Sequence, residues 1–422
     1  MKISLLHTPE GVRDVYGEEY DRKQAVSARI TEVIRGFGYS GLQTPVLEYF
    51  DIFSAERGSV ASNELFKLFD RDGNTMVLRP DITPAAARCI SKYYMYEELP
   101  VRLYYEGSTF VNSLSLRGSL KESSVIGAEF VNDASADADA EIIAMLISCL
   151  RAAGLTDFQV EIGLVDYFNG LMQDASLSEE NQARLRELIE SKNFFGVEEM
   201  LAGLDMDDSV RTALSRIPKL FGGIEQIRKA RELTNNARAL SALDRLEKLY
   251  AILSVYGLEK FVSFDLGMLG KFNYYTGIIF KAYTYGTGSP VATGGRYDNL
   301  LAQFGKKAPA TGFAIYLDDC LTAMRRQNIP VDTGRKISLI VYEQSCFADA
   351  VREAEERRSA GARTALVRRD PAKPEQDYQA YAAKYGMGSV TFITPAGEKT
   401  CGPAEEPAGG QPGNPSGGKE NG

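Results

Sequence analysis

The sequence predicts an α+β protein that has a helical insertion in its first part and a small α/β unit near its C-terminus. Up to residue 330, segments with strand patterns alternate with segments in which apolar residues recur at helical spacing. Residues from about 170 to 255 are charged and predict helices only. Residues 336–395 show strand, helix, strand, helix and strand patterns in turn, which is typical of a small unit with a mostly parallel sheet.

The first elements follow from apolar spacing and turn residues. After a turn-rich start in residues 1–16, apolar residues recur at helical spacing over residues 26–37, which predicts a helix. Residues 41–50 (GLQTPVLEYF) predict a strand. Asp72 and Gly73 stand between two apolar segments, and an Asp-Gly pair in that position is a strong signal for a hairpin turn.

The next segments alternate in type until the insertion begins. Residues 84–94 predict a helix, because a proline suits the first turn of a helix. Strands are predicted for residues 101–111 and 123–131, and a further helix for residues 138–154. The charged residues of the insertion itself are expected on solvated helix faces or against a partner subunit.

Strand patterns return after the insertion, in residues 261–269 and 273–285. Residues 292–301 (ATGGRYDNLL) predict a glycine turn that leads into a short helix, and residues 311–324 predict a strand that runs into a helix. Pro330 then marks a boundary between domains.

Three parts are therefore expected along the chain. A core covers residues 1–330 and contains the helical insertion at about 170–255. A small βαβαβ domain covers residues 336–395. Residues 396–422 have almost nothing apolar to bury, so this tail is expected to be disordered.

Composition restricts the classes of partner and of chemistry. The chain has 422 residues and a net charge of −9, with no basic run of the kind that nucleic-acid binders usually carry, so a nucleic-acid partner is not expected. The five cysteines are far apart and predict free thiols rather than disulfides. They are Cys89, Cys149, Cys320, Cys346 and Cys401.

Metal sites and membrane association are not expected either. His7 is the only histidine, which excludes the common Cys/His zinc sites, and we predict no metal and no cofactor. The N-terminal apolar stretch is too short for a signal peptide, and no apolar run reaches the roughly 20 residues of a membrane span. A soluble, cytoplasmic protein is expected.

Segments over roughly residues 5–328 resemble class II histidyl-tRNA synthetases, in the order in which that family carries them. The resemblance implies a mixed, mainly antiparallel sheet flanked by helices, which is the class II core, and a homodimer that packs through the second of these segments. The segments are TPEGVRDVYGEE, GYSGLQTPVLEYFDIF, VLRPDITPAAAR, the stretch from Tyr104 to Glu129, FNYYTGIIF, GGRYDNLL and TGFAIYLDD.

Three positions depart from the synthetase pattern in a way that bears on catalysis. The synthetases carry Arg where this chain has Val111, Gly270 and Asp319. Arginine suits a triphosphate because its planar fork pairs with phosphate oxygens, and Asp319 even inverts the charge. The departures therefore predict that the chain does not activate an amino acid with ATP and has no catalytic residues.

A synthetase-like core without these arginines is similar to the regulatory subunits of ATP phosphoribosyltransferase. That resemblance implies a non-catalytic subunit that binds the short-form catalytic subunit in the first step of histidine biosynthesis. It also implies a hetero-octamer built on the homodimer, and sensing of histidine as feedback inhibitor. Two alternatives remain, an active histidyl-tRNA synthetase and a synthetase-like module that binds RNA or another amino acid.

The resemblance also places a candidate histidine site. Asp81 and Thr83 stand where the family holds the ligand's ammonium group, and a carboxylate there can pair with a cation. Glu129 and Tyr275 stand where the imidazole is held, since Glu129 can accept the ring N–H. Tyr274 is expected on the opposite face of the same strand.

Two further departures leave the state of this site open. Val125 stands where a Gln is expected, and Gly270 removes a cation that would face the ligand's carboxylate. The pocket therefore either binds histidine or is vestigial, with polar groups that only satisfy one another.

Neighbouring residues have structural explanations. Arg79 and Arg88 are expected to be scaffold residues, and Tyr104 and Tyr105 are expected on opposite faces of a strand, one in the core and one at the surface.

Overall fold

The computed structural model describes residues 6–53, 60–113, 120–270, 274–334 and 336–403. The chain divides into two compact units. Residues 1–14 and 26–331 form the first unit, and residues 15–25 and 332–422 form the second.

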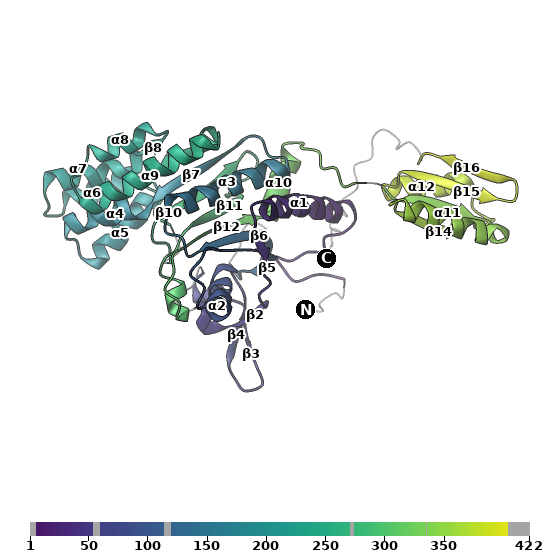
Figure 1. Cartoon of the computed structure of the whole chain (residues 1–422), viewed down its shortest axis with the longest axis horizontal. Coiled ribbons are helices and arrows are strands. Elements are labelled where there is room, and N and C mark those ends of the chain that lie inside the picture. The colour runs from purple at the N-terminus through teal and green to yellow at the C-terminus, as the bar shows by residue number, and fades with distance from the viewer. Residues whose placement is uncertain (1–5, 54–59, 114–119, 271–273, 335, 404–422) are drawn as a thin grey trace, which may run out of the picture. The chain divides into compact units, whose positions relative to one another are not determined.

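A mixed sheet of nine described strands is the centre of the first unit (Figure 1), in the order β1-β5-β6-β12-β11-β10-β7-β9-β8. The pairs β1–β5 and β7–β9 are parallel and the other neighbouring pairs are antiparallel, so the expected mainly antiparallel sheet is confirmed. The strands are β1 (Ser40–Gly41), β5 (Val101–Phe110), β6 (Glu122–Val131), β7 (Phe158–Leu164), β8 (Phe221–Gly222), β9 (Val262–Asp265), β10 (Ile278–Thr284), β11 (Ala292–Arg296) and β12 (Ala310–Tyr316).

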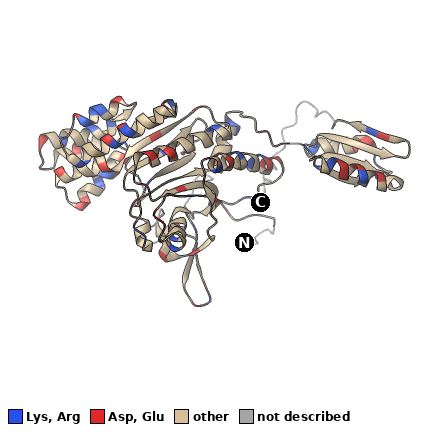
Figure 2. Ribbon diagram, in the orientation of Figure 1, with Lys and Arg blue, Asp and Glu red and all other residues tan. Residues whose placement is uncertain are grey.

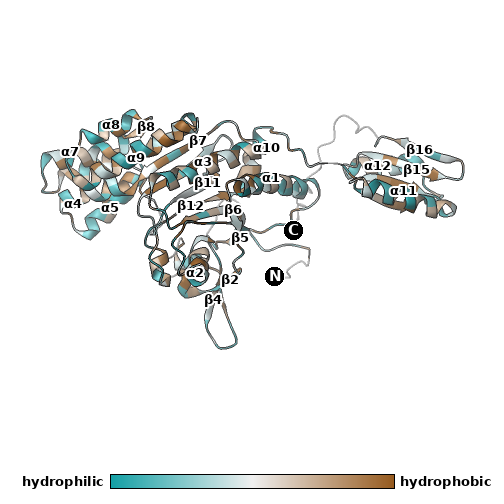
Figure 3. Ribbon diagram, viewed as in Figure 1, coloured by the Kyte–Doolittle hydropathy of each residue, from teal (hydrophilic) through white to brown (hydrophobic). Residues whose placement is uncertain are grey.

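Helices pack against this sheet and bury its apolar residues. Helix α3 runs from a cap at Ser135, whose hydroxyl accepts a hydrogen bond from the Ala138 amide, to Gly154 in the left-handed conformation. Its apolar face joins the main core together with residues of the sheet, and Figure 3 shows the hydrophobic residues of both elements. The core helices are α1 (Gly17–Gly36), α2 (Thr83–Tyr93), α3 (Ala136–Ala153) and α10 (Leu317–Arg326).

A smaller three-stranded sheet precedes α2 and contains the predicted hairpin. Strands β2 (Leu47–Tyr49), β4 (Thr75–Leu78) and β3 (Lys67–Phe69) pair antiparallel, with β4 in the middle. The turn lies at Asp72 and Gly73 as predicted, with Gly73 at φ 86°. Short 3₁₀ helices η1 (Phe50–Phe53) and η2 (Ser62–Glu64) flank this sheet.

The predicted helical insertion is present, and its apolar residues belong to the same core as the sheet. Figure 2 shows Lys, Arg, Asp and Glu distributed along its helices. The two-residue strand β8 is an exception to the expected all-helical segment, since it pairs with β9 and extends the large sheet. The elements are α4 (Val165–Ala175), α5 (Glu179–Glu190), α6 (Phe194–Ala202), α7 (Asp208–Arg216), η3 (Ile217–Lys219), α8 (Glu225–Arg231), α9 (Ala237–Val255) and η4 (Glu259–Phe261).

The glycine turn predicted in residues 292–301 is wrong, because Gly294 and Gly295 lie inside strand β11. A Cβ atom at Gly294 would overlap the Phe280 ring of the neighbouring strand, and one at Gly295 would lie 2.7 Å from the carbonyl oxygen of Ile278. These glycines therefore allow close approach between strands rather than a turn. The short helix that was predicted next exists as η5 (Leu301–Phe304).

The strand predicted over residues 273–285 begins later than expected. Strand β10 starts at Ile278, and residues 274–277 form an irregular segment before it. This segment, and not a strand, carries the two tyrosines of the candidate site.

The second unit contains the predicted βαβαβ pattern with one strand more. Strands β14, β13 and β15 are parallel neighbours. Residues 397–401, which were expected in the disordered tail, form β16, antiparallel to β15, and Lys399 reaches Glu375 at 2.8 Å. The backbone groups on the outer edge of β15 thereby gain partners. Residues 404–422 of the expected tail lie outside the described residues. The elements are β13 (Ser338–Tyr342), η6 (Gln344–Cys346), α11 (Phe347–Ser359), β14 (Thr364–Arg368), α12 (Glu375–Lys384), β15 (Ser389–Thr394) and β16 (Gly397–Cys401).

Candidate functional site

A cavity of about 240 Å³ lies in the first unit, and all five predicted site residues line it. Strands and loops that are distant in the sequence bring these side chains together. The five residues are Asp81, Thr83, Glu129, Tyr274 and Tyr275.

Glu129 occupies the inner end of the cavity. It lies on β6 and is 1% exposed. It faces Gly312 on β12, where a Cβ atom would overlap the Glu129 carboxyl group. The glycine of the TGFAIY segment therefore provides the space in which this acidic side chain fits.

Hydroxyl groups surround the Glu129 carboxyl group. Tyr105 donates to Oε1 at 3.2 Å, and Tyr297 donates to Oε2. The hydroxyl groups of Thr83 and Tyr105 are 3.3 Å apart. The Glu129 side chain is thus hydrogen-bonded at both oxygens before any ligand is considered.

Sequence reasoning missed Tyr105 and Tyr297. Tyr104 and Tyr105 were expected on a core face and a surface face, but both are buried because elements cover the sheet on both sides. Tyr297 lies within the GGRYD segment, which was interpreted as a turn. The register between β5 and β6 could have identified Tyr105. Leu103 pairs with Glu129, and Tyr105, two residues after Leu103, points to the same face of the sheet.

Burial governs the protonation of Glu129. Removal from water raises its pKa to about 8, although the hydrogen bonds from Tyr297 and Thr83 lower it. The charge of Asp81 also raises it. At neutral pH the group is therefore mostly a neutral carboxylic acid, and it ionises when a ligand supplies a compensating donor or positive charge.

The outer part of the cavity is formed by Asp81 and the tyrosine pair. Asp81 accepts hydrogen bonds from the Thr83 amide at 3.1 Å and from the Tyr274 hydroxyl at 3.2 Å. The Tyr274 ring packs on Tyr275 and Tyr297, with ring centroids 4.8 and 5.9 Å away. Tyr274 and Tyr275 therefore both line the cavity, which corrects their predicted opposite faces, because they precede β10 and do not follow its alternation.

The three positions that replace synthetase arginines carry no cation. Val111 lines the cavity beyond the end of β5. Gly270 has φ 81°, a backbone conformation that residues with a side chain rarely adopt. Asp319 is half-buried in the first turn of α10, where burial and the charge of Asp318 raise its pKa.

Of the described residues that line the cavity, none is Lys or Arg. Val125 presents an apolar side chain to it, where a Gln was expected. Arg79 lies behind the wall, where it donates to the backbone oxygens of Thr44 and Ser108, so its predicted scaffold role is confirmed. Arg88 pairs with Glu48 at 2.6 Å and is likewise structural.

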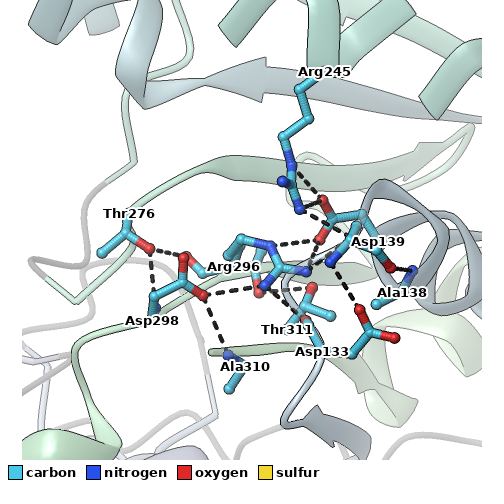
Figure 4. Close-up of polar contacts among 11 residues, drawn as sticks. Asp133, Ala138, Asp139, Arg245, Thr276, Arg296, Asp298, Ala310 and Thr311 are labelled. Carbon is cyan, nitrogen blue, oxygen red and sulfur yellow. Dashed lines mark hydrogen bonds and ion pairs between the residues drawn. The ribbon is translucent and has the colours of Figure 1, made fainter. Parts of the chain in front are cut away.

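A buried ion-pair network holds the loops behind the cavity (Figure 4). Asp139 of α3 is fully buried and accepts from Arg245 and Arg296. Asp298, two residues after Arg296, pairs with it at 3.1 Å. Tyr297 thus lies between two anchored residues.

Within the described residues, no group of three or more His, Cys, Asp or Glu side chains could hold a metal ion. Among the described helices, none has the length and apolar character that a membrane crossing requires.

Comparisons with known proteins agree on a family. A family model described as histidyl-tRNA synthetase matches residues 11–320. A relative from Acetivibrio thermocellus, named ATP phosphoribosyltransferase regulatory subunit, is 38% identical over 84% of this chain and 85% of its own length. A relative of the same name from Ruminiclostridium cellulolyticum is 36% identical over 92% of both chains.

Solved structures match in fold. A Bacillus halodurans protein described as an ATP phosphoribosyltransferase regulatory subunit/histidyl-tRNA synthetase has a TM-score of 0.84 and 32% identity, over 93% of this chain and 99% of that one. Histidyl-tRNA synthetase from Nostoc has a TM-score of 0.77 over 95% of this chain and 97% of that one, at 18% identity, and supports the fold alone.

The raised pKa of Glu129 predicts a pH-dependent stability. The unfolded chain releases this proton near the ordinary value of 4.5 and the folded chain near 8, so the folded state binds it more tightly and stability falls as pH rises between these values. Glu129→Gln stays neutral, so the free energy of unfolding of the wild type should fall relative to the variant by about 2–5 kcal/mol from pH 5 to pH 8. Urea unfolding at several pH values measures this difference.

Glu122→Gln is a matched control, because Glu122 lies exposed at the start of the same strand. The free energy of unfolding of Glu122→Gln should change with pH as that of the wild type does between pH 5 and pH 8. Parallel stability curves for wild type and Glu129→Gln would contradict the assignment of a buried neutral acid.

Proposed function

Because the chain belongs to the histidyl-tRNA synthetase family and, within it, to the regulatory subunits of ATP phosphoribosyltransferase, we propose that it binds and activates a short-form catalytic subunit of that enzyme. In this role it contributes no catalytic residue to the transfer of phosphoribosyl to ATP, the first step of histidine biosynthesis. The relatives of that name align over 84–92% of the chain, which supports a role for the whole chain and not for one module.

The observation that carries this proposal is a cavity that keeps polar recognition groups without the charges of ATP activation. Asp81 and Glu129 remain, whereas Val111 and Asp319 supply no positive charge for a triphosphate. A site of this kind can bind a small cationic or hydrogen-bonding ligand but cannot neutralise a nucleotide. An active synthetase is therefore supported less well, and a net charge of −9 gives an RNA-binding module little support.

We further propose histidine as the ligand of the cavity and feedback inhibition as its purpose. Asp81 would hold the ammonium group, with Thr83 beside it. Glu129 would accept the imidazole N–H and Tyr275 would face the other ring nitrogen. The hydrogen bonds among these groups also fit a vestigial pocket, and a binding measurement separates the two states.

The assembly that we propose is a homodimer of this chain within a hetero-octamer, in the cytoplasm. Support for the dimer comes from large apolar side chains exposed on and beside the three-stranded sheet, whose strand β2 lies within the expected dimer segment. They are Val46, Leu47, Tyr49, Leu68 and Phe69, between 40% and 72% exposed.

The purified chain should not form histidyl-adenylate, because the arginine positions around the expected nucleotide hold no cation. Pyrophosphate exchange with histidine and ATP should stay at the level of a protein-free blank. A related histidyl-tRNA synthetase in the same assay serves as positive control. Histidine-dependent exchange well above the blank would contradict a non-catalytic role.

The chain should co-purify with the short-form catalytic subunit from the same genome. That subunit alone should form little phosphoribosyl-ATP, and addition of this chain should raise its rate. Gel filtration and an absorbance assay of the product measure both effects. Two folded chains that stay separate at micromolar concentration would refute the proposed partnership.

Histidine binding should depend on Glu129. The N–H of a bound imidazole favours the ionised carboxyl group, so affinity should rise as pH approaches about 8. Glu129→Gln should lose the part of this pH dependence that Glu129 contributes, leaving that of the ligand's imidazole. It should bind roughly ten- to a hundredfold more weakly at pH 8, because a charge-assisted hydrogen bond contributes about 1.5–3 kcal/mol. Calorimetric titration at pH 6 and pH 8 measures both effects.

Val125→Gln is the companion variant for this titration. It restores the expected amide in the wall of the cavity and should bind histidine as tightly as the wild type or more tightly. If millimolar histidine gives no heat with the wild type, the pocket is vestigial, while the proposed subunit role rests on the co-purification.

A further inference from the structure

The buried ion-pair network joins the helical insertion to the cavity. Asp139 is 0% exposed and lies on α3. One of its oxygens, Oδ2, accepts from Arg245 of α9 at 2.5 and 2.8 Å. The other, Oδ1, accepts from Arg296 of β11 at 2.8 Å. A single carboxylate is therefore shared by one cation from the insertion and one from the central sheet (Figure 4).

The Arg296 side of the network leads directly to the cavity. Arg296 also donates to the Asp133 carbonyl oxygen and to Asp298, each at 3.1 Å. Asp298 in turn accepts from the Ala310 amide at 3.3 Å. Tyr297 is the residue between Arg296 and Asp298, and its hydroxyl donates to Glu129. The position of Tyr297 is thus set by the hydrogen bonds that hold Arg296 and Asp298 on either side of it.

The same network holds the tyrosine pair. The Thr276 amide donates to the Arg296 carbonyl oxygen at 2.8 Å, and the Thr276 hydroxyl accepts from the Asp298 amide at 3.0 Å. Thr276 directly follows Tyr274 and Tyr275. A shift of Arg296 would therefore displace three of the aromatic residues that line the cavity.

The Arg245 side of the network reaches the surface. Its side chain is 27% exposed and lines an open groove of about 890 Å³ beside α9. Asp139, in contrast, has no contact with water and depends on its two arginines for compensation of its charge. Loss of Arg245 would leave the carboxylate to Arg296 alone, so the geometry of Arg296 would change with it.

We propose that Arg245 is a positioning residue for the ligand cavity, acting through Asp139, Arg296 and Tyr297 on Glu129. Ligand affinity is then coupled to the position of α9, and any contact that moves this helix changes the affinity. The coupling is reciprocal, so an occupied cavity also resists movement of α9. This inference rests on the proposed ligand site.

Arg245→Met tests the proposal, because methionine keeps most of the apolar stem and removes the charge. Calorimetric titration with L-histidine at pH 8 should show roughly five- to fiftyfold weaker binding. Arg238→Met is the matched control, since Arg238 lies on the same helix and pairs with Asp166 at the surface. It should change the affinity less than about twofold.

Tyr297→Phe separates positioning from a general loss of structure. This variant removes the branch of the network that ends at Glu129 and keeps the branch through Thr276, so Arg245→Met should weaken histidine binding by a smaller factor in the Tyr297→Phe background than in the wild type. Equal weakening with and without the Tyr297 hydroxyl, or equal effects of Arg245→Met and Arg238→Met, would overturn the proposal.

Arg245→Lys is a second variant that tests the proposal if Arg245→Met does not fold. Lysine keeps the charge but not the fork, and intermediate affinity is expected. An affinity equal to that of the wild type would count against positioning by the guanidinium. Absence of histidine binding by the wild type would overturn this inference, whereas the subunit role would be decided by the co-purification with the catalytic subunit.

Discussion

The first unit depends on one carboxylate that is sealed from water. Asp139 lies where α3, α9 and β11 meet, and the two guanidinium groups that reach it come from the latter two elements. An isolated charge at that depth would be very unfavourable, so Asp139 requires a guanidinium group from each of the other two elements. Such a contact adds little net stability compared with an apolar one, but it permits few alternative arrangements. The positions of the insertion and of the loops behind the cavity follow from it.

Glu129 is a second buried acid, and its carboxyl group has hydrogen-bond partners of a different kind from those of Asp139. Asp139 is met by cations, whereas Glu129 is met by the hydroxyl groups of Tyr105 and Tyr297 and retains its proton. A neutral acid among hydroxyl groups can exchange partners at lower cost than a buried ion pair can. The rigid acid therefore lies in the scaffold and the adaptable acid lies at the ligand site.

Much of the fold was predictable from local patterns, and the errors have physical causes. The charged residues of the insertion, which show no strand alternation, predicted its helices, and the Asp72-Gly73 pair predicted the hairpin. The role of Gly294 was mistaken because a glycine that permits strand contact resembles, in sequence, one that permits a turn. Residues 397–401 are polar, and their strand exists only because the edge of β15 is available for pairing, which no local pattern reveals.

The candidate site was predictable only through resemblance. Asp81, Thr83, Glu129, Tyr274 and Tyr275 line one cavity, although 194 positions separate the first from the last. Whether they bind histidine stays a prediction. Tyr297 escaped notice because its function depends on a long-range contact with Glu129. The link from Arg245 to the cavity could not be found without coordinates, since all of its steps except the one from Arg296 to the next residue join different elements.

Gly270 makes an arginine unfavourable at one of the three positions that depart from the synthetase pattern. Its backbone lies at φ 81°, where an arginine would be strained by about 1–2 kcal/mol before it contacted any substrate. Gly270→Arg would therefore lower stability, and the site would still lack the cations of the synthetase pattern at Val111 and Asp319. The conformation of Gly270, and not only the missing charge, thus opposes a synthetase-like site at this position.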